Sequence, residues 1–290
     1  MKRILKKHKN SSPSTTKVNN LLIRSLTGFF FIVVVIGSIL IGRPAFSVVF
    51  FVFNIFTLHE YYKLVRINTV TANKPFIGIA GGSVLYVIAC LVSNELIGKE
   101  WLLLTLLVPI IIIVAEIFLD RNKPESNIAL TLSGIFYVSI PFSVLPFFYN
   151  PAFIPGGSHP NILLGFFLIL WTYDTFAYLV GMSLGKHKFF QRISPNKTWE
   201  GTIGGFVFAM AVSWALSLFF VEYNLFNWLS IGFITALFGT FGDLAESMLK
   251  RSLNVKDSGK MLPGHGGFLD RFDAVLLAAP AVFIFLVIAI

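Results

Sequence analysis

Long apolar stretches separated by short polar loops occupy most of this chain. Nine of them approach the roughly 20 residues that a helix needs to cross the hydrocarbon core of a bilayer. They lie at residues 21–42, 45–58, 76–93, 101–119, 128–148, 162–182, 203–221, 228–248 and 272–290. The second is the least regular, because Asn54, Thr57 and His59 interrupt it. The pattern predicts an all-α, polytopic integral membrane protein with about nine transmembrane helices.

Composition agrees with a chain that lies mostly in the membrane. It is 56% hydrophobic and 13% charged, whereas soluble domains carry roughly 25% charged residues. Residues 1–20 differ, because they are rich in Lys, Ser, Thr and Asn. We therefore expect a basic, disordered cytoplasmic tail over residues 1–20 and a single transmembrane domain over residues 21–290.

The distribution of basic residues predicts the orientation. With the N-terminus in the cytoplasm, 21 of the 23 Lys and Arg residues fall in the tail or in inside loops, and only Arg43 and Lys99 fall outside. Lys and Arg concentrate on the cytoplasmic side of membrane proteins. We expect a multi-pass protein of the cell inner membrane. Its net charge of +9 follows from this topology, so anionic membrane lipids are predicted partners and nucleic acid is not.

Acidic residues inside the last four predicted spans point to a functional site, since ionisable groups in a membrane are costly. Asp174 would lie about eight residues, or roughly 12 Å, from the cytoplasmic end of its span. Asp243 and Glu246 would lie in the last two turns of the eighth span, and Asp270 and Asp273 at the start of the ninth. All five are therefore expected at the cytoplasmic leaflet.

The spacing of these acids suggests a metal site. Asp243 and Glu246 are three residues apart, as are Asp270 and Asp273, so each pair shares a helix face. Buried carboxylates repel one another, and Mg²⁺ suits carboxylates that act together with substrate phosphates. We expect Asp243 and Asp270 to be ligands and Glu246 to be either a ligand or a salt-bridge partner. The alternative is that the acids only pair with nearby basic residues, namely Lys250, Arg251 and Arg271.

Two cytoplasmic loops are candidate phosphate sites. Residues 263–267 (Pro-Gly-His-Gly-Gly) lead into the ninth span, where glycine backbone and helix N-terminal amides favour anions. His265 would either donate to a phosphate or order this loop. In the other loop, Ser194 is expected to cap the seventh span, with Pro195 as its first residue. Lys197 would then oppose the helix dipole, which predicts that an anion binds there; the alternative is a snorkelling lysine.

Residues 247–273 resemble the C-terminal signature of the phosphatidate cytidylyltransferases, also called CDP-diacylglycerol synthases. The signature orders Ser-x-apolar-Lys-Arg, four residues, Lys-Asp-x-small, and His-Gly-Gly-apolar-x-Asp-Arg-apolar-Asp. Every element is present: Ser247, Leu249, Lys250, Arg251, Lys256, Asp257, Gly259, Leu262, Pro263, His265, Gly266, Gly267, Phe268, Asp270, Arg271, Phe272 and Asp273. Residues 194–201 and the span of Asp174 also resemble the family, whereas the first five spans match only in size and hydropathy.

The resemblance implies a membrane enzyme, commonly a homodimer, that converts CTP and phosphatidate to CDP-diacylglycerol and pyrophosphate with Mg²⁺. In such a reaction the lipid phosphate attacks the α-phosphorus of CTP, so the protein need only align the substrates and neutralise charge. The resemblance implies that Asp243 and Asp270 bind the metal, and it allows a second, monovalent cation. The active site would lie in residues 164–290 at the cytoplasmic face.

These considerations give the following candidate site. The predicted catalytic residues are Asp243, Asp270, Lys197, Asp273, Lys256 and His265. The predicted substrate-binding residues are Lys250, Arg251, Arg271, Gly264, Gly266, Gly267, Ser194, Thr198 and Asp174. The predicted metal ligands are Asp243, Asp270 and Asp273, with Asp174 as a partner behind them.

Two other functions fit parts of the pattern. A CTP-dependent lipid or polyprenol kinase would transfer the γ-phosphoryl group and would need a base for the acceptor hydroxyl, for which His265 or Asp257 could serve. An ion-coupled transporter would use buried carboxylates, but many transporters contain internal repeats, and the sequence has no clear repeat. A transporter would also have acids at mid-membrane that are accessible from outside, whereas here all are expected on one side.

Overall fold

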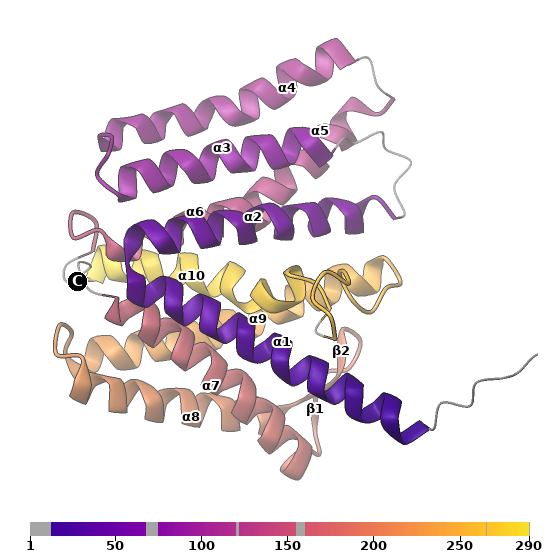
Figure 1. The fold of residues 1–290 in the computed structure, drawn as a ribbon, viewed down its shortest axis with the longest axis vertical. Coiled ribbons are helices and arrows are strands. Elements are labelled where there is room, and N and C mark those ends of the chain that lie inside the picture. The colour runs from indigo at the N-terminus through magenta and orange to yellow at the C-terminus, as the bar shows by residue number, and fades with distance from the viewer. Residues whose placement is uncertain (1–12, 68–74, 120–121, 155–159, 265, 290) are drawn as a thin grey trace, which may run out of the picture.

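The computed structural model describes residues 13–67, 75–119, 122–154, 160–264 and 266–289 (Figure 1). Ten α-helices, three irregular helical segments and one short hairpin make up the described chain. The first half contains α1 (Pro13–Ile41), α2 (Arg43–Val65), α3 (Pro75–Ser93), η1 (Lys99–Leu106), α4 (Leu107–Leu119), α5 (Pro124–Gly134), η2 (Ile135–Ser139), α6 (Ile140–Val144) and η3 (Leu145–Tyr149). The second half contains α7 (Asn161–Leu184), β1 (Lys188–Phe190), β2 (Ser194–Thr198), α8 (Trp199–Phe219), α9 (Leu225–Ser252) and α10 (Leu269–Ala289).

The predicted all-α membrane fold is confirmed. In the described part of the chain, eight helical segments are long and apolar enough to cross a membrane, and α1 adds a shorter apolar stretch at Ser25–Ile41. The irregular second stretch is one of the eight, and its helix runs from Arg43 to Val65. α1 begins at Pro13, within the segment that we predicted to be a disordered tail; residues 1–12 lie outside the described residues.

One span is built from four consecutive helical pieces. Residues Pro124–Tyr149 form a single apolar span, but a π-helical turn at Ile135–Ser139 and a 3₁₀ turn at Leu145–Tyr149 interrupt its α-helical geometry. Pro141 and Pro146 lack the N–H that an α-helix would donate four residues back, so they favour such local changes of winding.

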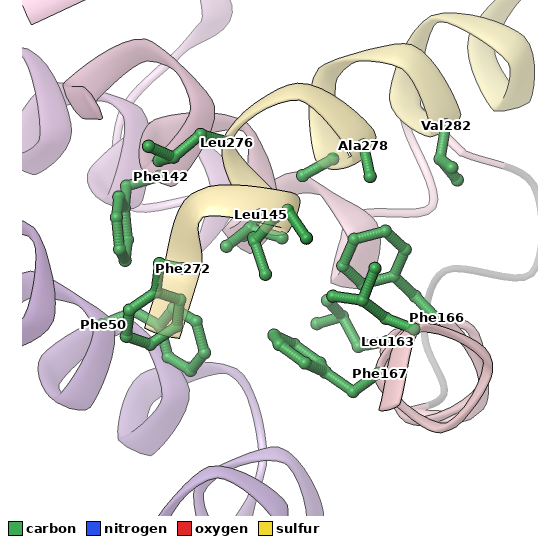
Figure 2. Close-up of a cluster of buried hydrophobic side chains, with 14 of the residues drawn as sticks. Phe50, Phe142, Leu145, Leu163, Phe166, Phe167, Phe272, Leu276, Ala278 and Val282 are labelled. Atoms are coloured by element: carbon green, nitrogen blue, oxygen red, sulfur yellow. The ribbon is translucent and has the colours of Figure 1, made fainter. Parts of the chain in front are cut away.

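Helix α10 lies between two groups of helices (Figure 1). It packs against α9 on one side and against α2, α6 and η3 on the other. Phe272 of α10 is buried, and its ring centroid lies 5.0 Å from that of Phe142 and 5.8 Å from that of Phe50. Figure 2 shows these rings together with Phe166 and Phe167 of α7. The aromatic core therefore fixes the position of α10, whose N-terminal end carries Asp270 and Asp273.

The prediction that Ser194 caps the seventh span was wrong. Ser194 instead begins β2, which pairs antiparallel with β1 through Lys188 opposite Thr198 and Phe190 opposite Ser194. α8 begins at Trp199, and its cap is Thr198, whose side chain accepts a hydrogen bond from the Gly201 N–H at 3.2 Å. Threonine is also a good cap, and pairing with β1 keeps residues 194–198 extended. Lys197 therefore precedes the helix and does not lie in its first turn.

The polar loops with functional candidates gather at one end of the bundle. In Figure 1 the β1–β2 hairpin and the loop between α9 and α10 lie at the right-hand end, where α2 and α4 also end. Since consecutive spans run antiparallel, this is the end to which the alternation of basic residues assigns the inside loops.

Candidate active site

Two cavities adjoin at this end of the molecule. The first has a volume of about 600 Å³ and lies among α7, β2, α9 and α10, with Asp174, Lys197, Asp243 and Asp273 in its wall. The second has a volume of about 680 Å³ and lies against the loop between α9 and α10. Asp270 and Arg271 line both cavities. The start of α10 is thus the boundary between an acidic compartment and a basic one.

Three helices supply the carboxylates of the first cavity. Asp174 comes from α7, Asp243 from α9 and Asp273 from α10. They lie close enough to repel one another electrostatically, and Glu246 adds to the repulsion felt by Asp273. Such a cluster is unfavourable without cations, so the positions of the nearby lysines are informative.

Two lysines neutralise part of this charge. The Nζ of Lys197 lies 2.6 Å from Oδ2 of Asp243. The Nζ of Lys250 lies 2.7 Å from Oδ1 of Asp270 and forms a second ion pair with the buried carboxylate of Glu246. Glu246 is therefore a salt-bridge partner here. The ion pairs of Lys250 are those expected from the alternative in which the acids pair with nearby basic residues.

Asp270 organises the glycine-rich loop. Its Oδ2 accepts hydrogen bonds from the Ser258 backbone N–H at 3.1 Å, the Ser258 hydroxyl at 2.9 Å and the Gly267 N–H at 2.9 Å. Within the loop, the Leu262 N–H donates to the Gly266 carbonyl at 3.0 Å. Gly264 and Gly266 have φ values of 76° and 81°, which other residues rarely adopt. The loop conformation thus depends on glycine at these two positions and on hydrogen bonds to the Asp270 carboxylate.

The second cavity is strongly basic. Its walls include the side chains of Lys250, Arg251, Lys256 and Lys260, of which the last three are exposed. The guanidinium of Arg251 also donates to the carbonyls of Ile193 and Val255, both at 3.4 Å, so it links the hairpin to the loop. Several cations around glycine backbone are suited to a polyphosphate.

Most predicted site residues come together around these two cavities. Around the first lie Asp174, Ser194, Lys197, Thr198, Asp243, Asp270, Arg271 and Asp273. Around the second lie Lys250, Arg251, Lys256, Gly264, Gly266, Asp270 and Arg271. Gly267 is buried beneath the loop, and His265 lies outside the described residues. Among the described residues, no three His, Cys, Asp or Glu side chains are grouped so that they could hold a metal ion unaided.

Sequence reasoning missed two residues of the site. Tyr173 lines the first cavity, and its hydroxyl is 2.5 Å from that of Thr240. Glu60 of α2 is 1% exposed and accepts a hydrogen bond from the Leu269 N–H at 3.0 Å. In the sequence, only the position of Tyr173 next to Asp174 could have indicated that it belongs to the site. Glu60, like the other acids, is a carboxylate near the inner end of a predicted span. Nothing in the sequence indicated that it contacts α10.

The fold and the site together define an integral membrane protein that presents carboxylates, lysines and a glycine-rich loop at one end of a helix bundle. The sequence profile of the cytidylyltransferase family matches residues 22–289, so the chain belongs to this family. Among its relatives is the phosphatidate cytidylyltransferase of Staphylococcus haemolyticus, which is 34% identical over 272 residues, 91% of this chain and 98% of that protein. The phosphatidate cytidylyltransferase of Staphylococcus aureus (strain COL) is 44% identical over 179 residues, 61% of this chain and 66% of that protein.

Proposed function

We propose that this protein is a phosphatidate cytidylyltransferase, which transfers the cytidylyl group of CTP to the phosphate of phosphatidate and releases pyrophosphate. One observation carries the proposal: an acidic cavity among the spans and a basic cavity in the loop meet at Asp270 and Arg271. A reaction between a lipid phosphate and a nucleotide needs two adjoining sites that share a wall, so that the reacting groups can meet. The names of the relatives support the same activity.

The basic cavity is suited to the triphosphate of CTP. Lys250, Arg251 and Lys256 would neutralise its charge, and Gly264 and Gly266 would let backbone approach it closely. These groups would also hold the pyrophosphate as it leaves.

The acidic cavity would receive the headgroup of phosphatidate through its two cations, Lys197 and Arg271, and through a metal ion held on its carboxylates. Its wall includes Tyr178 and Met182 of α7, both 67% exposed, which is what a wall open towards lipid would contain. A lipid that entered between the helices would bring its phosphate towards Lys197 and Arg271. The hairpin residues Ser194 and Thr198 border the same cavity and would help to orient the headgroup.

The carboxylates fit Mg²⁺ as a cofactor. Mg²⁺ is usually bound by one or two carboxylates together with phosphates and water, so a closed set of three protein ligands is not required. Asp243 and Asp270 would hold it, with Asp273 as a further ligand and Asp174 behind them. When bound, Mg²⁺ supplies neutralisation of charge on the transferring phosphoryl group. The remaining carboxylate charge in the acidic cavity also supports a second, monovalent cation.

The chemical step needs no protein nucleophile. An oxygen of the lipid phosphate attacks the α-phosphorus of CTP, and the bond from that phosphorus to the oxygen bridging to the β-phosphorus breaks. CDP-diacylglycerol and pyrophosphate result. The protein contributes alignment of two anions, through Lys197 and Arg271 on one side and the loop lysines on the other. Lys197 and Lys250, which pair with Asp243 and Asp270, would turn towards the phosphates as the substrates enter.

We further propose that the site faces the cytoplasm at the cell inner membrane and that the protein is a homodimer. The concentration of basic residues at the end that holds the site supports the orientation. Exposed apolar side chains along α4, among them Ile117 at 73% and Phe118 at 83%, offer a surface for either lipid or a second copy.

Product analysis tests the activity. Purified protein is incubated with phosphatidate, Mg²⁺ and CTP that is labelled at the α-phosphorus. Label in the lipid together with one pyrophosphate for each lipid formed supports the proposal. Release of CDP with transfer of the γ-phosphoryl group would identify a kinase instead.

A further inference from the structure

Helix α10 begins without a capping side chain of its own. Phe268 occupies the N-cap position, because its carbonyl accepts hydrogen bonds from the N–H groups of Arg271 at 3.0 Å and Phe272 at 3.2 Å. A phenylalanine side chain has no acceptor for the unpaired amides of the first turn. The amides at the start of this helix are buried together with Phe268 and Leu269, so they need an acceptor from elsewhere in the molecule.

Glu60 of α2 supplies that acceptor from 209 positions away. Its Oε2 accepts a hydrogen bond from the Leu269 N–H at 3.0 Å, and its side chain is buried. A carboxylate at a helix N-terminus is also favoured by the helix dipole, and more so where it is shielded from water. The first half of the chain therefore caps the helix that carries Asp270.

Both arms of the glycine-rich loop pack against the same carboxylate. A Cβ added at Gly259 would lie 2.6 Å from Cδ of Glu60, and a Cβ added at Gly267 would lie 2.8 Å from it. Neither distance is tolerable between non-bonded carbons, so glycine at both positions allows the loop to close on Glu60. Asp270 also binds the loop, through Ser258 and Gly267. The loop is held between two carboxylates, one from each half of the molecule.

We infer that Glu60 is a positioning residue for the active site. It fixes the first turn of α10 and the two arms of the loop, and so sets where Asp270 and Arg271 stand between the cavities. The expected effect of Glu60 on turnover rests on the proposed function, whereas its expected effect on the conformation of the loop does not. Glu60 thereby gives the first half of the chain a defined part in the site.

The test compares two isosteric variants, Glu60→Gln and Glu116→Gln. Glu116 is a matched control, because it is also a buried carboxylate of the first half, 7% exposed, and its Oε1 accepts from Asn127 at 2.6 Å. It lies on α4, which packs against α3, α5 and η1. Amide hydrogen exchange is measured on peptides that cover residues 256–273. Loss of the charged cap should raise exchange at Leu269 and its neighbours about tenfold in Glu60→Gln. Glu116→Gln should leave these peptides unchanged.

Kinetics supply a second readout. Glu60→Gln should lower kcat by about tenfold with a smaller change in the KM for CTP, because misplacing Asp270 affects the transition state more than ground-state binding. Glu116→Gln should keep the kcat of the parent. Glu60→Asp should recover part of the loss, since it retains the charge.

A double-mutant cycle separates contact from general destabilisation. Gly259→Ala should impair the parent strongly, whereas in a Glu60→Ala background it should add little, because the clashing carboxylate is gone. Loop exchange in Glu60→Gln equal to that of the parent, or fully additive effects in the cycle, would overturn the inference. If Glu60→Ala cannot be purified, amide hydrogen exchange in Glu60→Gln alone tests the role of Glu60. A parent without cytidylyltransferase activity would refute the proposed function, while the exchange measurement would still decide the role of Glu60.

Discussion

Replacing Lys197 by Gln tests whether the hairpin takes part in the reaction. Lys197 forms an ion pair with Asp243 at 2.6 Å, and the two side chains are 24% and 35% exposed. A pair this accessible contributes about 0.5–1 kcal/mol to stability, so the melting temperature should change by only a few degrees. Contact with a phosphate in the transition state is worth about 1.5–3 kcal/mol, which corresponds to a ten- to hundredfold loss in kcat/KM. Catalysis should therefore fall much further than stability.

The assay measures kcat/KM for CTP at saturating phosphatidate, alongside thermal unfolding in the same detergent. Lys188→Gln is the control, because Lys188 lies on the same hairpin, opposite Thr198, and is exposed. It should behave like the parent. Lys197→Arg should rescue only partly, since a planar guanidinium and a compact ammonium contact phosphate differently. A kcat/KM for Lys197→Gln within twofold of the parent would refute the phosphate role and leave Lys197 as a partner of Asp243 alone.

Two further changes test the metal site and the topology. Asp270→Asn should lower kcat by about a hundredfold or more, because it removes a charged ligand while one oxygen can still accept from the loop amides; purified variant with near-parent turnover would remove Asp270 from the ligand set. A cysteine introduced by Lys260→Cys in a Cys90→Ala background should react with an impermeant thiol reagent only from the cytoplasmic face, and labelling in intact cells from outside would contradict the orientation. Lys260 is exposed, whereas a side chain at the neighbouring Gly259 would clash with Glu60.

The spans could be predicted from the sequence because the bilayer imposes their length and their apolar character. Asp174, Asp243, Asp270 and Asp273 were found for a related reason, since each is an ionisable group in an apolar stretch at a depth that simple counting gives. The start of α8 could not be predicted in this way. Ser194 and Thr198 are both good caps, and the choice between them depends on the pairing of β2 with β1.

Contacts between segments that are distant in the sequence could not be predicted from local sequence patterns. Nothing in the sequence around Glu60 indicates that it caps α10, because the two are joined only when α10 packs between α2 and α9. The pairing of Lys197 with Asp243 likewise depends on how the hairpin lies over α9. The glycine-rich loop could be recognised from its residues. Its position between an acidic and a basic cavity could be seen only in the folded structure.

The central claim is that the two cavities bring a lipid phosphate and CTP together at Asp270. The most direct measurement reconstitutes the parent and Asp270→Asn in vesicles with phosphatidate and Mg²⁺, adds CTP labelled at the α-phosphorus, and counts label in the lipid fraction. We expect labelled CDP-diacylglycerol with equimolar pyrophosphate from the parent, and almost none from Asp270→Asn. Label that stays in the nucleotide pool with the folded parent protein would contradict it.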